Sequence, residues 1–304
     1  MLEDFNNRAS LETIRELTDG HRWEELRHFT HRALKMIDES PHPFPELFLK
    51  RVVDSAHQTG ISYTESFVAA RRLGGTALER HEFIAKNCQG LDEGTYVSLG
   101  CECHAWNLLN RWGFRNSIRD LSPLCLGVHR FPQLFDILES EFKNYAQIGN
   151  ISAKTHRASQ LDMVVDKAYG VTWNHHRGSE WTVNEFERFR EHVSELIPNF
   201  YQSSKRPGAV HIVSRWVSFV PSDVSSLDRL LRIIENAGAS CPRLIILDFE
   251  ENKMTPGLHR IADNVDFISS PYPPGYEWSN PKYRNSPEGL EWEKNLVSHV
   301  LDAL

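Results

Sequence analysis

A cysteine at the start of a predicted helix is the residue best placed for nucleophilic chemistry. The segment 100–104, Gly-Cys-Glu-Cys-His, follows the short β-prone run 96–99 and precedes a helical pattern over 104–112. Unpaired N–H groups and the dipole at a helix N-terminus favour a thiolate, which is the nucleophile, and could hold an oxyanion. We therefore expect a lowered pKa at Cys103 and predict it as the nucleophile. The alternative is that Cys101 and Cys103 are small buried residues at a strand-to-helix corner.

The same cluster contains Cys and His residues that could bind a metal. Structural zinc sites usually combine two ligand clusters, commonly with two to four residues between cysteines. The remaining cysteines, Cys88, Cys125 and Cys241, form no second pair. The sequence therefore predicts no metal and no cofactor.

A thiol nucleophile needs a base, and two adjacent histidines are candidates. His175 and His176 follow the β-prone run 171–174 and precede a turn. This pattern predicts an imidazole at a strand end, where it could accept the thiol proton. The alternative is a surface loop with ordinary histidines.

A third residue commonly orients the base of such a pair. Asp248 follows the apolar run 244–247, so we expect it at the carboxyl end of a buried strand, where α/β folds collect their sites. An Asp that caps a loop is the alternative. Asp120 and Asn174 are further candidates for the third residue.

The elements that position these residues indicate an α/β fold. Apolar runs at 209–213, 244–247 and 265–268 predict strands, and helical patterns separate and follow them. We expect a largely parallel or mixed sheet flanked by helices, preceded by an all-helical N-terminal region. The predicted domains are a helical appendage of helical hairpins at 1–92 and an α/β catalytic domain at 93–304. The predicted helices span about 22–39, 45–60, 64–73, 76–87, 104–112, 131–145, 183–201, 226–237 and 288–303. The segment 271–287 is expected to be a long surface loop.

Composition excludes several classes of protein. The formal net charge is −7 and the pI is about 6.1, which argues against nucleic-acid binding. The beginning of the sequence has no signal-peptide pattern, and no apolar run reaches the length of a membrane span. We therefore expect a cytoplasmic protein in which the five cysteines are free thiols.

Two segments of the sequence resemble a bacterial family. Residues 97–109, Val-Ser-Leu-Gly-Cys-Glu-Cys-His-Ala-Trp-Asn-Leu-Leu, with 112–115, and residues 169–175, Tyr-Gly-Val-Thr-Trp-Asn-His, are similar to the two conserved blocks of DUF1796. That family is described as papain-like cysteine peptidases. The resemblance covers about residues 95–215 and implies that Cys103 is the nucleophile and His175 the base. If so, the two side chains should lie about 3–5 Å apart.

Three functions follow as hypotheses. The first is a papain-like cysteine peptidase or amidase, or an acyltransferase, acting through an acyl-enzyme on Cys103. The second is a glycosyltransferase of polysaccharide or cell-surface biosynthesis, whose aromatic loop (Tyr272, Tyr276, Trp278 and Tyr283) would suit a glycan. The third is a non-catalytic binding protein, favoured if Cys103 is deeply buried and lies far from His175. The substrate, whether peptide, acyl compound or glycan, is undefined, and the N-terminal helices offer a surface on which a protein partner could dock.

Overall fold

The structure is a computed structural model that describes residues 8–91, 94–101, 103–114, 120–157, 159–215, 224–251, 254–278 and 280–304. Packing divides the chain into two compact units. The helical unit comprises residues 1–94, 107–118 and 273–297, and the α/β unit comprises residues 95–106, 119–272 and 298–304. This grouping by packing is not contiguous in sequence, unlike the division predicted at residue 92.

The helical unit is built from amphipathic helices that pack on their sequence neighbours. In α3, the buried side chains Leu26, Phe29, Ala33 and Ile37 recur every three or four residues, as the sequence pattern predicts. Pro45 caps α4, where its fixed φ suits the start of a helix. The helices are α2 (Arg8–Asp19), α3 (Trp23–Glu39), α4 (Glu46–Gln58), α5 (Tyr63–Leu73), α6 (Gly75–Asn87), α13 (Pro281–Arg284) and most of α14 (Pro287–Ala303).

The α/β unit contains a mixed five-stranded sheet that is mostly parallel, as predicted. Its strands lie in the order β1-β5-β6-β8-β7, and only β7 runs antiparallel to its neighbour. The carboxyl ends of β1, β5, β6 and β8 therefore lie along one edge. The strands are β1 (Tyr96–Ser98), β5 (Val210–Arg215), β6 (Arg243–Asp248), β7 (Gly257–Ala262) and β8 (Val265–Ser269).

A second, antiparallel sheet of three strands in the same unit was not predicted from the sequence. It contains β2 (Ile151–Thr155), β3 (Asp162–Asp166) and β4 (Val171–Arg177) in that order. Most side chains of β2 are exposed or half-buried, so β2 lacks the apolar run that marks a buried strand. Of these three strands, only the β-prone character of 171–174 was recognised in the sequence.

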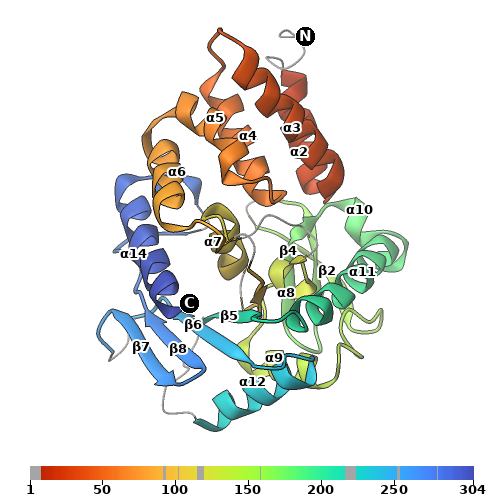
Figure 1. Cartoon of the computed structure of the whole chain (residues 1–304). Helices are drawn as coiled ribbons and strands as arrows, with labels where there is room; N and C mark the ends of the chain where they lie inside the picture. The colour runs from red at the N-terminus through yellow and green to blue at the C-terminus, as the bar shows by residue number, and fades with distance from the viewer. Residues whose placement is uncertain are drawn as a thin grey trace. The chain divides into compact units, whose positions relative to one another are not determined.

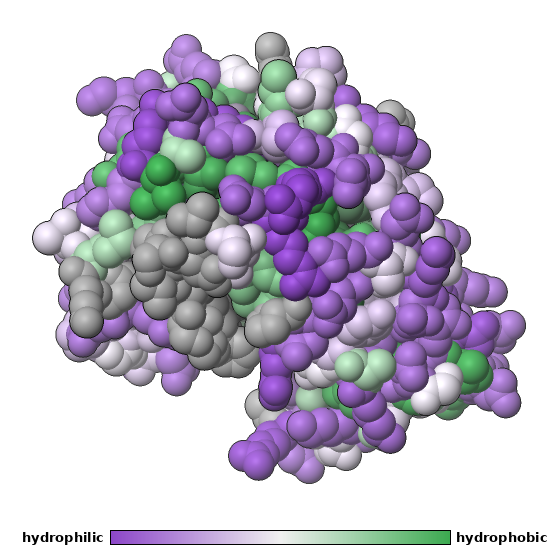
Figure 2. Space-filling model, turned by 90° about the horizontal axis from the view of Figure 1, so that it is seen from below, coloured by the Kyte–Doolittle hydropathy of each residue, from purple (hydrophilic) through white to green (hydrophobic). Residues whose placement is uncertain are grey.

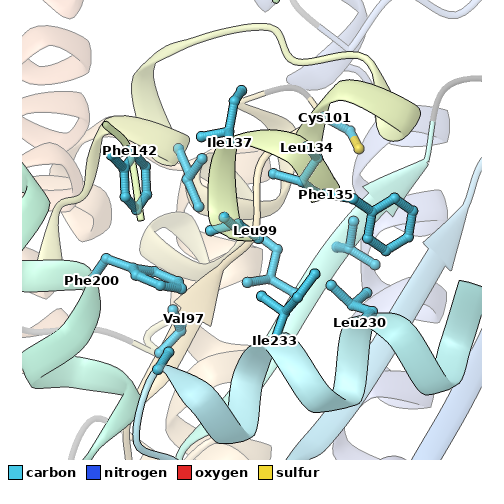
Figure 3. Packing of buried hydrophobic residues seen from close by; sticks show 14 of the residues in the cluster. Val97, Leu99, Cys101, Leu134, Phe135, Ile137, Phe142, Phe200, Leu230 and Ile233 are labelled. Atoms are coloured by element: carbon cyan, nitrogen blue, oxygen red, sulfur yellow. The ribbon is translucent and has the colours of Figure 1, made fainter. Parts of the chain in front are cut away.

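The core of the α/β unit joins the parallel sheet to its helices. Figure 3 shows Val97 and Leu99 at the end of β1 among side chains of α9 (Phe131–Glu139), α11 (Glu187–Ser204) and α12 (Val224–Asn236). Leu134 and Phe135 come from α9, and Leu230 and Ile233 come from α12. α9 and α12 lie side by side (Figure 1). These contacts fix the strand end from which the Cys103 segment leaves.

Several predicted helices differ in extent. The helix expected over 131–145 ends at Glu139 in α9, and Glu141, Phe142 and Ala146 then adopt positive φ values. The helix expected from residue 183 starts at Glu187, after three residues with positive φ at 184–186. Because a left-handed residue cannot continue a right-handed helix, the apolar periodicity alone overestimated both helices. The segment expected to be a loop, 271–287, contains the short helix α13.

The view in Figure 2 shows a predominantly hydrophilic face on which hydrophobic residues occupy separate areas. Among the described residues, the large exposed hydrophobic side chains are Leu47, Ile148, Leu161, Val183, Tyr283 and Leu304. No helix in the described part of the chain is both long and apolar enough to cross a bilayer.

Candidate active site around Cys103 and His175

The loop after β1 turns sharply to deliver Cys103 to the start of α7 (His104–Arg111). Gly100 and Cys101 have φ values of +82° and +71°. A Cβ on Gly100 would lie 3.0 Å from Nδ1 of His129 and 3.2 Å from the carbonyl oxygen of Leu124. A side chain at position 100 would therefore be both strained and crowded, which explains the glycine. Cys103 itself is buried, with 3% of its surface exposed.

His175 lies in a β-bulge of β4. Met163 and Val164 are consecutive on β3, yet they pair with Arg177 and Trp173 on β4, which leaves residues 174–176 outside the regular ladder. Bulges of this kind redirect side chains and occur frequently beside active sites. The bulge separates the two adjacent histidines: His175 is exposed, whereas His176 is buried.

The two predicted residues meet. Nε2 of His175 lies 3.2 Å from Sγ of Cys103, a distance compatible with a hydrogen bond and within the range expected from the sequence. His176, in contrast, packs against the rings of Trp181 and Phe189, at centroid distances of 4.7 and 5.2 Å. The structure therefore distinguishes His175 from His176 as the partner of the thiol.

Arg177 closes the bulge and places a positive charge near His175. Its Nε donates a hydrogen bond to the carbonyl oxygen of Asn174, across the bulge. The dense surroundings of His175, followed by the charge of Arg177, hold the pKa of its imidazole below the ordinary value. Because His175 keeps solvent-exposed surface, water screens part of this effect. The result is a neutral imidazole at pH 7.

A dipeptide connects the nucleophile loop with the histidine strand. Val128 forms an antiparallel bridge with Thr172 of β4, through hydrogen bonds of 2.8 and 3.1 Å. The next backbone N–H, that of His129, donates to the carbonyl oxygen of Cys101 at 3.0 Å. Residues 128 and 129 therefore hold the Cys103 loop and the β4 strand in one hydrogen-bonded network.

The ring of His129 has a defined tautomer. Burial lowers the pKa of His129 to about 4, so the ring is neutral at pH 7 and carries one N–H. Nδ1 lies 3.1 Å from the carbonyl oxygen of Gly127, which can only accept, so Nδ1 is the donor. Nε2 therefore accepts from the hydroxyl of Tyr145 at 2.7 Å. This buried chain stabilises the turn against which Gly100 packs.

A second polar group at the sheet edge, next to Cys103 in the sequence, was not predicted. Nδ1 of His104 lies 3.1 Å from the hydroxyl of Tyr272, which follows β8. The His104 ring is fully buried and packs against the rings of Phe249 and Tyr272, at centroid distances of 4.6 and 6.0 Å. The sequence placed His104 beside Cys103 and Tyr272 in an aromatic segment, but their meeting depends on the strand order.

The candidates for the third residue lie in different parts of the α/β unit. Asp248 is fully buried at the carboxyl end of β6, as predicted. The Asp120 carboxylate accepts hydrogen bonds from Ser203 at 3.0 Å and Arg206 at 2.7 Å, and so stabilises the end of α11. Asn174 lies in the bulge beside His175. A catalytic role for Asp248 stays a prediction.

Comparison with known proteins adds no relative. No family model matches the chain, and neither a curated protein nor a solved structure is similar to it. The resemblance to DUF1796 therefore stays a prediction.

Proposed function

We propose that this protein is a thiol enzyme in which Cys103 attacks an acyl carbonyl and His175 transfers the proton. The observation that carries the proposal is the 3.2 Å distance between Sγ of Cys103 and Nε2 of His175. A buried thiol with an imidazole at hydrogen-bonding distance has the geometry of an activated nucleophile. A non-catalytic binding protein would be favoured if Cys103 were both deeply buried and far from His175; Cys103 is buried, but its Sγ lies 3.2 Å from Nε2 of His175.

The reaction would proceed in two steps, acylation of Cys103 and release of the acyl group. His175 takes the thiol proton while sulfur bonds to the carbonyl carbon, and the carbonyl electron pair moves to oxygen. The tetrahedral intermediate collapses, and the leaving amine or alcohol takes the proton from His175, which leaves a thioester on Cys103. Water then releases the acid, as in a peptidase or amidase, or an acceptor hydroxyl or amine takes the acyl group, as in an acyltransferase.

Two features of the surroundings support these steps. The first turn of α7 follows Cys103 directly, and its N–H groups could stabilise the oxyanion of the tetrahedral intermediate. The pKa of His175 is held below its ordinary value, so the imidazole is neutral and able to accept a proton at pH 7. The exposed surface of His175 gives an acyl substrate access to the pair.

Competition between two cysteines tests the proposal. Cys103 is buried and Cys241 is exposed, so accessibility alone predicts faster alkylation of Cys241. With brief iodoacetamide treatment at pH 7 and mass spectrometry of each peptide, we expect Cys103 to be labelled first. Incubation with p-nitrophenyl acetate should give a hydroxylamine-sensitive acetyl group on Cys103. Faster labelling of Cys241 together with no thioester on Cys103 would refute the mechanism.

A further inference from the structure

The helical unit contains a polar cavity that the proposed acyl chemistry does not use. Its volume is about 230 Å³, and its lining includes the α5–α6 junction at Gly74 and Gly75, with Lys50, Asp54 and Arg80. All of its lining residues belong to the helical unit. We propose that this cavity is a binding site for a phosphate group, at the N-terminus of α6.

The backbone at the start of α6 leaves room for an anion. Gly74 and Gly75 have φ values of +69° and +54°, and a Cβ on either residue would meet no atom within 4 Å. The N-cap Gly74 provides no side-chain cap, and the first turn of α6 has no acidic residue. The first N–H groups of a helix have no partner within the helix, and together with the dipole they attract anions.

Arg80 supplies an independent reason to expect an anion. Only 3% of its surface is exposed, and its Nη2 is 3.5 Å from Oδ1 of Asn285. Its Nε has no hydrogen-bond partner among the residues that the structure describes. Within the described residues, no carboxylate lies at ion-pairing distance from its guanidinium group. A buried charge without a counter-ion is unfavourable, and helical side chains lean towards the N-terminus of their helix. Arg80 thus lines the cavity at the start of its own helix.

The surrounding charges leave positive charge available. Glu46, which also lines the cavity, forms an ion pair with Lys50, and buried Glu293 forms one with Arg111. Asp54 is the other carboxylate of the lining and opposes an anion. Burial and the charge of Arg111 lower the pKa of Arg284, to about 10. Burial likewise lowers the pKa of Arg80. The charge of Arg111 also lowers this pKa, whereas the charges of Glu293 and Asp54 raise it. In and around the cavity, four cationic groups therefore outnumber three carboxylates. The cations are Lys50, Arg80, Arg111 and Arg284, and the carboxylates are Glu46, Asp54 and Glu293.

The ligand class follows from these donors. A guanidinium group, an ammonium group and helix N–H groups together match the several oxygens of a phosphate better than a single carboxylate. The cavity is smaller than a typical pocket for a drug-sized ligand. It therefore suits free phosphate or the phosphate of a small monoester.

Thermal unfolding of the full chain in phosphate tests the site. We expect the melting temperature to rise in about 20 mM phosphate, relative to chloride at equal ionic strength, because a ligand of the folded state stabilises it. The same measurement with glycerol phosphate distinguishes a site that accepts a phosphate monoester from one that accepts only free phosphate. Cys103→Ala should respond as the wild type does, since the site is independent of the acyl chemistry.

Three variants locate the site. Arg80→Met should abolish the response, and Lys50→Met, on the exposed side of the cavity, should weaken phosphate binding about tenfold in calorimetry. Arg51→Met changes an exposed arginine on the same helix as Lys50 and should bind like the wild type. If Arg80→Met does not fold, Lys50→Met against Arg51→Met decides. The proposal is overturned if the wild type does not bind phosphate, or if Lys50→Met and Arg51→Met bind it equally.

Discussion

The two strands that supply the candidate catalytic pair position their residues in different ways. β1 ends in a buried loop where Gly100 and Cys101 adopt left-handed conformations, and α7 begins directly after Cys103. β4 carries His175 on a bulge that Arg177 closes through the carbonyl oxygen of Asn174. The first arrangement depends on local backbone conformation, whereas the second depends on pairing with β3. Both residues nevertheless depend on contacts with distant segments, but only the strand-to-helix junction at Cys103 can be recognised from the local sequence.

The adjacent histidines provide the sharpest test of this comparison. His175→Ala should slow alkylation of Cys103 by at least about 100-fold, because it removes the base, and should leave the melting temperature nearly unchanged. His176→Ala should lower the melting temperature and leave the alkylation rate of Cys103 nearly unchanged, since His176 packs against Trp181 and Phe189. Timed alkylation and thermal unfolding of both variants measure the two effects. Equal loss of reactivity in both variants would show that the bulge does not separate their roles.

The β1 loop should be the more sensitive region to a change of backbone. Gly100→Ala introduces a Cβ at φ +82° and 3.0 Å from the His129 ring, so we expect a loss of about 2–3 kcal/mol in the free energy of unfolding. Gly149→Ala is the matched control, because its Cβ would meet no atom within 4 Å. Urea denaturation gives both values. A loss below about 0.5 kcal/mol for Gly100→Ala would mean that the loop adapts and does not fix Cys103.

Two substitutions of Arg177 separate the effect of its charge from that of its hydrogen bond to the carbonyl oxygen of Asn174. Arg177→Met removes both, so the pKa of His175 should rise, and alkylation of Cys103 should slow about tenfold as the bulge loosens. Arg177→Lys keeps the charge but loses the Nε contact, so the pKa should stay low while the rate falls.

Titration of the His175 ring by NMR and timed alkylation provide the two measurements for these variants. Arg157→Met, which changes an exposed arginine between β2 and β3, should alter neither. Identical titrations for the Met and Lys variants of Arg177 would remove the charge from the explanation.

The smallest effect is expected where the two regions are joined. Tyr145→Phe removes the hydroxyl that donates to His129, which leaves a buried ring nitrogen without a donor and should cost about 1 kcal/mol. Tyr201→Phe is the control, since the buried Tyr201 hydroxyl has no partner among the described residues and its removal should be neutral or stabilising. Chemical denaturation of both variants checks the difference. Equal losses would contradict the tautomer assigned to His129.

The sequence predicted the parts of this molecule that depend on local pattern. The apolar run of β6 is continuous, and the runs of β5 and β8 are each interrupted by one buried polar residue, His211 and Asp266. Because these runs are typical of strands buried on both faces, a mostly parallel sheet could be expected. The helix after Cys103 was predicted from its spacing of apolar residues. β2 was missed because its side chains are largely exposed, and β3 because its apolar run, Met163 to Val165, is only three residues long.

What the sequence determined by itself is therefore the position of Cys103, at a strand-to-helix junction, together with Asp248 at a strand end. Only the tertiary structure decided that His175 and not His176 contacts the thiol, because that choice depends on a bulge in pairing with β3. It also decided that Asp248 lies at the end of a strand of the other sheet, and that His104 meets Tyr272. Strand order and bulges arise from contacts between distant segments, and no local pattern of residues specifies them.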